Sequence, residues 1–187
     1  HNRVRARRQF FTHNGSGAFM KTEADSFALA REMVRIGNGA GRKTIAVVSD
    51  MDQPLGYAVG NALEVREAIE TLKGNGPEDF VELCMTLGSY MLVAGGKAAD
   101  QEAAERILRE VIANGSALEK LAEFVAAQGG DRELVYHPDR LPQPSIAQEI
   151  ESPMDGYIQR IVCDEIGICS LLLCGGRETK ESEIDLS

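Results

Sequence analysis

A short apolar run between two helical patterns indicates the fold class of this chain. Residues 44–48 read TIAVV, a nearly continuous apolar stretch rich in β-branched side chains, which is typical of a strand buried on both faces. Before it, apolar side chains recur at helical spacing over residues 27–36, behind Thr22 or Asp25 as N-cap and before Gly37 as helix end. A helix followed by such a strand predicts an α/β unit.

The loop after this strand is the first place to expect a functional site. Residues 49–56 read SDMDQPLG and lead into a helix predicted near residues 59–73. Loops at the carboxyl ends of parallel strands are where α/β sheets place their binding sites.

The rest of the chain is predicted to be mostly helical. Capping signals are Asp100 for one helix and the pair Ser116 and Glu119, a capping box, for another. Further expected elements are helices at 77–94, 100–113, 116–127 and 164–174, strands at 147–151 and 157–162, and a proline-rich extended loop at 131–144. Helix therefore dominates the predicted α/β arrangement.

Composition bounds the class of protein. The 187 residues, 43% of them hydrophobic, can bury one sizeable core, so a single domain is the default. A net charge of −9 does not suit a nucleic-acid backbone binder, although the first 21 residues hold five basic and no acidic side chains. No apolar run reaches the roughly 20 residues that span a bilayer, and no apolar stretch follows the N-terminal arginines as in a signal peptide. We expect no nucleic-acid partner and no membrane association.

The four cysteines predict a reducing compartment. Cys84, Cys163, Cys169 and Cys174 form no C-x-x-C pair, and three of them lie in one apolar stretch. Buried thiols in the cytoplasm are the preferred interpretation, with metal or disulfide roles as alternatives.

Several polar motifs have ordinary explanations as well as functional ones. Residues 14–20 (NGSGAFM) can present amides to an anion but lack the G-x-G-x-x-G spacing, so an ordinary turn is favoured. Arg177 and Lys180 can hold a phosphate or can follow a glycine helix stop. The three histidines are too scattered for a helical zinc site. The three glutamates spaced by three on one predicted helix normally form a solvated face with neighbouring basic residues; they are Glu64, Glu67 and Glu70.

From Gly15 onward the sequence closely resembles the pyrimidine-nucleoside phosphorylase and thymidine phosphorylase family. The longest matching segments are residues 53–65 (QPLGYAVGNALEV) and 67–74 (EAIETLKG). Shorter matches are GSGAFMK at 15–21, GRKT at 41–44, SDM at 49–51, GPED at 76–79, LGS at 87–89, AQGGD at 127–131, DGY at 155–157, DEIG at 164–167 and GGR at 175–177. The nearly unbroken match over residues 53–74 makes this a specific resemblance.

The resemblance implies a cytoplasmic, homodimeric pentosyltransferase. Members of the family cleave uridine, thymidine or deoxyuridine with inorganic phosphate, giving the free pyrimidine and a (deoxy)ribose 1-phosphate. The fold it implies is a helix-rich, partial α/β domain of the nucleoside phosphorylase and phosphoribosyltransferase type, without the family's N-terminal helical domain and C-terminal α+β domain. The family's phosphate and base contacts align upstream of Gly15, so no catalytic or substrate-binding residue is assigned and the chain alone is expected to be inactive.

The resemblance also implies a monovalent cation, usually potassium, and no organic cofactor. The family holds this cation through main-chain oxygens of the loop after a strand and through one glutamate of the next helix. These positions fall on Leu55, Ala58 and Glu67. The donor set fits the chemistry, because hard cations prefer carbonyl and carboxylate oxygens.

Residues 1–14 depart from the family pattern. The family has an apolar strand ending in a lysine-containing pair here, whereas this chain has His13 and Asn14 behind an arginine-rich segment. Buried unpaired arginines are costly, so we predict a non-homologous or disordered basic leader over 1–14 and a partial central α/β domain over 15–187. Two alternatives to the phosphorylase remain: a noncatalytic fragment or interaction subunit that complements an N-terminal half, and a related phosphoribosyltransferase-fold enzyme.

Overall fold

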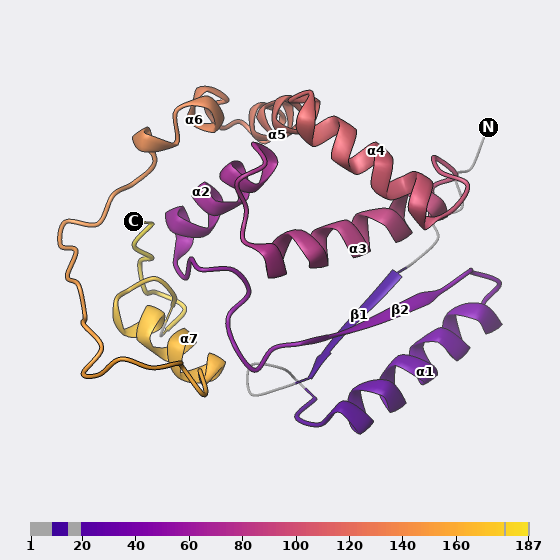
Figure 1. Ribbon diagram of the computed structural model, residues 1–187, viewed down its shortest axis with the longest axis horizontal. Helices are drawn as coiled ribbons and strands as arrows, with labels where there is room; N and C mark the ends of the chain where they lie inside the picture. The colour runs from indigo at the N-terminus through magenta and orange to yellow at the C-terminus, as the bar shows by residue number, and fades with distance from the viewer. Residues whose placement is uncertain (1–8, 15–19, 178, 187) are drawn as a thin grey trace. The chain divides into compact units, whose positions relative to one another are not determined.

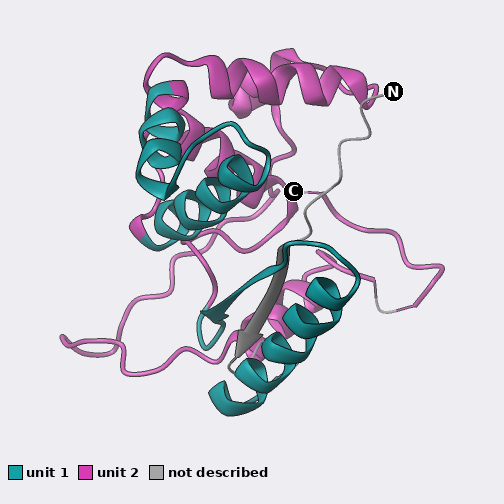
Figure 2. Cartoon of the chain, turned by 90° about the vertical axis from the view of Figure 1, so that its right-hand side faces the viewer, with its two compact units in different colours: residues 1–53, 79–110 teal, residues 54–78, 111–187 magenta. Residues whose placement is uncertain are grey.

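The chain divides into two compact units, which Figure 2 shows in different colours. The computed structural model describes residues 9–14, 20–177 and 179–186. The first unit contains His1–Gln53 and Asp79–Glu110, and the second contains Pro54–Glu78 and Val111–Ser187.

The first unit contains the predicted α/β element. Strand β1 (Gln9–Asn14) pairs in parallel with β2 (Ile45–Asp50), in a register that places Gln9 beside Ile45. Helix α1 (Glu23–Gly39) connects the two strands and packs against both of them (Figure 1). The predicted helix followed by a strand is confirmed.

Helix α1 begins as predicted and ends later. The side chain of Thr22, one of the two candidate caps, accepts a hydrogen bond from the amide of Asp25 at 3.1 Å. The helix continues past Gly37 to Gly39, so the prediction that Gly37 ends it is wrong. A Cβ at Gly37 would lie 2.0 Å from Oγ1 of Thr44, so glycine is required there by the close approach of the segment before β2.

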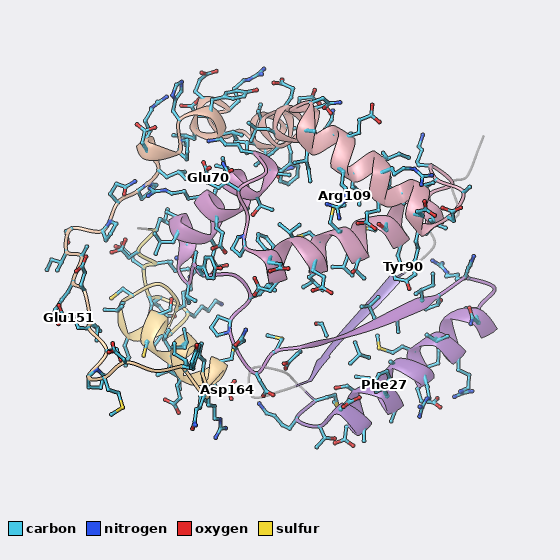
Figure 3. The ribbon with its side chains drawn as sticks, in the orientation of Figure 1. Phe27, Glu70, Tyr90, Arg109, Glu151 and Asp164 are labelled. Atoms are coloured by element: carbon cyan, nitrogen blue, oxygen red, sulfur yellow. The ribbon has the colours of Figure 1, made fainter. Side chains whose placement is uncertain are left out.

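The expectation that β2 is buried on both faces is wrong. Its side chains are half-buried from Ile45 to Ser49, and Asp50 is exposed. An apolar pocket of about 360 Å³ lies where α1 and β2 meet. Its lining includes Phe27 and Val34 of the helix and Val48 of the strand. Phe27 is labelled on α1 in Figure 3. Packing against α1 therefore only partly covers the strand.

Helices α3 (Glu78–Ala94) and α4 (Gln101–Ala113) agree with their predicted ranges within a residue. Asp100 caps α4 as expected, because its Oδ1 accepts from the amide of Ala103 at 2.8 Å. Gly88 lets the two helices come close, since a Cβ there would lie 2.9 Å from Cδ1 of Leu108.

The second unit is built on a small apolar core. Ile69 of α2 (Asn61–Leu72), Ala122 of α5 (Ser116–Ala127) and Val135 of α6 (Glu133–Tyr136) are buried together. A 3-10 turn, Pro138–Arg140, follows α6. Residues 131–144 are thus not wholly extended as predicted, because a helical turn carries Val135 into the core.

The predicted capping box of α5 does not form. The N-cap is Gly115, at φ +79°, and the Ser116 hydroxyl instead donates to Oδ1 of Asn114 at 2.6 Å. Glu119 bonds to Arg132 and Tyr136, so these tertiary partners replace its local capping role.

The two strands predicted at 147–151 and 157–162 are not present. The structure assigns no strand there, and Ile150 and Tyr157 are 93% and 98% exposed. A strand requires hydrogen bonds from a neighbouring chain segment, which a local sequence pattern does not supply. The predicted helix at 164–174 is confirmed in shorter form as α7 (Cys163–Leu172).

The cysteines differ from the prediction in burial. All four are free thiols, but Cys84, Cys169 and Cys174 are exposed and Cys163 is half-buried. Apolar neighbours in sequence did not make them core residues.

No helix in the described part of the chain has the length and apolar character needed to cross a membrane.

The predicted leader is described in part. Residues 9–14 form β1, so the disorder considered for this segment is not found there, and residues 1–8 lie outside the described residues. The turn predicted at 14–20 also lies largely outside them. The non-homologous origin of residues 1–14 stays a prediction.

Candidate functional site

The carboxylate of Glu67 is held against the loop that precedes its own helix. Its Oε1 accepts hydrogen bonds from the amides of Tyr57, at 2.9 Å, and Ala58, at 3.1 Å. Glu67 lies in the second turn of α2, so the helix places its side chain back over the loop. These two hydrogen bonds to one carboxylate oxygen attach the loop to helix α2.

Gly56 allows this approach. Its φ is +71°, in the left-handed region that favours glycine, and a Cβ built on it would lie 2.2 Å from Oε2 of Glu67. Backbone conformation and close contact therefore both require glycine at this position.

A second glutamate binds the end of the same loop. Oε1 of Glu64 accepts from the amide of Gly60 at 3.2 Å. Together, Glu64 and Glu67 attach residues 57–60 to α2 through backbone amides. Glu64 is exposed, as expected of a solvated face, but its partner is a loop amide and not a basic neighbour, whereas Glu67, the ligand implied by the resemblance, is half-buried.

Glu70, the third glutamate of the series, behaves as predicted. It accepts from Nζ of Lys73 at 2.8 Å and from the Asn75 amide at 3.3 Å, and it lies near the end of α2 in Figure 3. The hydrogen bond from Lys73 is the main cause that holds the pKa of Glu70 below its ordinary value. The expected partner Arg66 instead donates to the carbonyl of Pro138 at 3.4 Å.

An open, acidic pocket of about 710 Å³ lies beside the loop. Its lining includes Tyr57 and Ala58 of the loop and the carboxylate-bearing residues Glu67, Glu70 and Glu78, against one arginine, Arg66. Glu70 is paired with Lys73, so Glu67 and Glu78 against Arg66 leave a small negative excess, which favours a cation over an anion.

The structure brings two of the three predicted ligand residues into direct contact. Ala58 and Glu67 meet through the amide of Ala58, and Leu55 lies three residues earlier in the same loop, 44% exposed. The predicted ligands from Leu55 and Ala58 are their carbonyl oxygens. An ionised carboxylate has about four lone-pair sites, so two accepted amides leave Glu67 capacity for a cation.

The predicted site would use main-chain oxygens more than side chains. Within the described residues, no three His, Cys, Asp or Glu side chains come together in a group that could hold a metal ion. A single carboxylate beside loop carbonyls suits a hard monovalent cation, which prefers neutral oxygens with little added charge.

Comparison with known proteins gives the family. The family model described as "Glycosyl transferase family, a/b domain" matches residues 4–118, more than half of the chain. The chain belongs to this glycosyl transferase family. The α/β class predicted from the strand at 44–48 is thereby confirmed.

Individual relatives of this chain confirm the closer resemblance. The chain is 55% identical over 173 residues to the pyrimidine-nucleoside phosphorylase of Bacillus subtilis (strain 168) and 54% identical to that of Geobacillus stearothermophilus. It is 53% identical to that of Staphylococcus aureus (strain USA300). Each alignment covers 92% of this chain and 40% of the relative. The chain therefore spans less than half the length of these relatives.

The structure gives no support for the other candidate site residues, Arg177 and Lys180. Arg177 and Lys180 are exposed after α7, as expected of a charged surface behind a glycine helix stop. Sequence reasoning missed Gly56 and Glu64, whose roles depend on contacts between the loop and the helix. The only sequence signal was their place within the segment of strongest resemblance, residues 53–65.

Proposed function

We propose that this chain serves in the phosphorolysis of pyrimidine nucleosides. The observation that carries the proposal is 55% identity to a pyrimidine-nucleoside phosphorylase over 92% of the chain. The reaction joins an oxygen of inorganic phosphate to C1′ of the pentose while the bond from C1′ to the pyrimidine nitrogen breaks. The base leaves with the bonding electrons and takes up a proton, and the other product is a (deoxy)ribose 1-phosphate.

The contribution we propose for the described residues is a potassium site at residues 55–67. Carbonyl oxygens of Leu55 and Ala58 and the carboxylate of Glu67 would hold the ion. Support comes from the contact between Glu67 and this loop, from the acidic pocket beside it, and from the glycine that allows the close approach. A bound ion would supply fixed positive charge at this loop.

The experiment for the activity is a complementation assay. The aligned region is 40% of the length of the Bacillus subtilis relative, so we expect the 187 residues alone to give no turnover. Co-expression with the N-terminal half of that relative should give release of uracil from uridine or thymine from thymidine that requires phosphate. Reactions without phosphate are the control. A stable complex of the two chains without phosphate-dependent cleavage would overturn the proposal.

We also propose a homodimer in the cytoplasm for the complemented enzyme. The family resemblance supports the dimer, and the free state of all four cysteines fits a reducing compartment. Sedimentation equilibrium of the complex gives its stoichiometry, and a mass of one copy of each chain would contradict the dimer.

A further inference from the structure

The first residue of α2 connects three distant parts of the second unit. The side-chain amide of Asn61 donates to the carbonyl of Gly175 at 2.9 Å and to the carbonyl of Asp185 at 2.8 Å. Both of its N–H donors are thus used on residues more than 110 positions away in sequence. This side chain therefore serves as more than a local helix signal.

Backbone hydrogen bonds complete this connection. The amide of Ala62 donates to the carbonyl of Leu186 at 3.1 Å, and the amide of Asp185 donates to the carbonyl of Cys174 at 2.8 Å. The amide of Ala62 belongs to the first turn of α2, where helix amides have no partner within the helix. The segment that ends at Leu186 therefore supplies an acceptor that the helix itself lacks.

The loop at residues 55–60 directly precedes this start of α2. Asn61 follows Gly60 directly, and Glu64 and Glu67, in the first and second turns of α2, accept hydrogen bonds from the amides of Gly60 and of Tyr57 and Ala58. Leu55 and Tyr57 are exposed, at 44% and 86%, and Ala58 and Val59 are only half-buried, so apolar packing covers the loop incompletely. Its position depends on polar contacts to α2, and the start of α2 depends on Asn61.

We propose that Asn61 is a positioning residue for the cation loop, residues 55–60, acting by fixing the start of α2 to Gly175 and Asp185. The proposal rests on the proposed cation site at Leu55, Ala58 and Glu67. Asn61 touches no ion and acts through the loop that would hold it. Through its two donated hydrogen bonds, the affinity of the loop for the cation would depend on Gly175 and Asp185, which are far away in sequence.

The decisive variant is Asn61→Asp in the full 187-residue chain. Aspartate has nearly the same shape as asparagine, but an oxygen replaces the NH₂ group that carries both donors. This oxygen can only accept, and it would face the carbonyl oxygens of Gly175 and Asp185. An acidic residue in the first turn favours a helix through the dipole, so a merely local helix role predicts no loss for this variant. The proposal predicts that Asn61→Asp loses affinity for the cation. The variant therefore distinguishes a positioning role from a local helix role.

Two readouts are required. The first is amide hydrogen exchange at Tyr57 and Ala58, which we expect to be faster in Asn61→Asp than in the wild type. The second is binding of thallium(I), a potassium substitute observed by its own NMR signal and competed by potassium. We expect affinity to fall roughly tenfold or more, as for residues that orient metal ligands elsewhere.

The matched control is Asn114→Asp. Oδ1 of Asn114 accepts from the amide and the hydroxyl of Ser116, so the change to aspartate keeps both bonds. It should leave exchange at Tyr57 and Ala58 and thallium affinity at wild-type values. Asn61→Gln keeps both donors on a longer arm and should restore part of the affinity, which keeps the test valid if Asn61→Asp does not fold.

The outcomes separate the two proposals. Unchanged exchange at Tyr57 and Ala58, or unchanged thallium affinity in a wild type that binds the ion, overturns the role of Asn61 alone. A wild type that binds no thallium overturns the proposed cation site and the role of Asn61 with it. Faster exchange together with weaker binding in Asn61→Asp supports both.

Discussion

Gly56 and Glu67 are in such close contact that a single added Cβ at position 56 would lie 2.2 Å from Oε2 of the carboxylate. The same carboxylate accepts the next two amides of the chain, those of Tyr57 and Ala58. Loop conformation and carboxylate position therefore depend on each other. A change at either residue should disturb both.

Gly56→Ala should lower the stability of the second unit by more than backbone strain alone. A left-handed conformation costs an L-residue about 1–2 kcal/mol, and the new methyl group must also displace Glu67. Gly74→Ala is the control, because Gly74 has φ +93° but nothing within 4 Å of its would-be Cβ. Urea unfolding of both variants measures the difference. Equal losses would show that the contact with Glu67 contributes nothing.

Glu67→Gln should weaken potassium-specific stabilisation. The neutral amide keeps the shape but removes the charge, and its NH₂ group cannot accept a hydrogen bond from the loop. A ligand that binds the folded state raises its stability by RT ln(1 + [L]/Kd), so melting temperatures in potassium chloride against equal choline chloride report the affinity. We expect at least a roughly tenfold loss of affinity. Glu102→Gln is the control, since Glu102 is exposed on α4, pairs with Arg106 and does not line the pocket beside the loop.

Ile69→Ala should be the most destabilising of these changes. Ile69 is 1% exposed and packs with Ala122 and Val135, so the truncation leaves a cavity and should cost about 2–5 kcal/mol. Val65→Ala on the same helix starts from a side chain that is 48% exposed and should cost about 0.5 kcal/mol or less. Denaturant unfolding compares the two. Similar costs would mean that α2 is not anchored by Ile69.

Acid should weaken the contact between α5 and α6. The hydrogen bond from Tyr136 is the largest cause that lowers the pKa of Glu119 from its ordinary value of 4.5, and Arg132 lowers it further. Because the folded pKa is lowered, the stabilisation is complete above about pH 4.5 and is lost as the pH falls through the folded pKa. Urea midpoints from pH 7 to pH 3 should converge for wild type and Glu119→Gln at the acidic end. Tyr136→Phe should reduce the difference, and parallel profiles would contradict the prediction.

Local signals in the sequence predicted most of the helices. Thr22 and Asp100 cap their helices through bonds to amides three residues ahead, so neighbouring positions alone were sufficient to place them. The predictions failed where partners are distant. Glu119 was predicted to cap its own helix but bonds to Arg132 and Tyr136 instead. Residues 147–151 and 157–162 form no strands, because strand pairing depends on another segment of the chain.

The candidate site follows the same division. The residue pattern alone predicts that a β-branched strand precedes a loop and a helix, and the resemblance carried by residues 53–74 indicates Leu55, Ala58 and Glu67. The hydrogen bonds of Glu64 and Glu67 to loop amides, and those of Asn61 to Gly175 and Asp185, became visible in the folded chain. Helical hydrogen bonds join residues four apart, so the chain order shows them, whereas side-chain contacts across loops depend on how the whole unit packs.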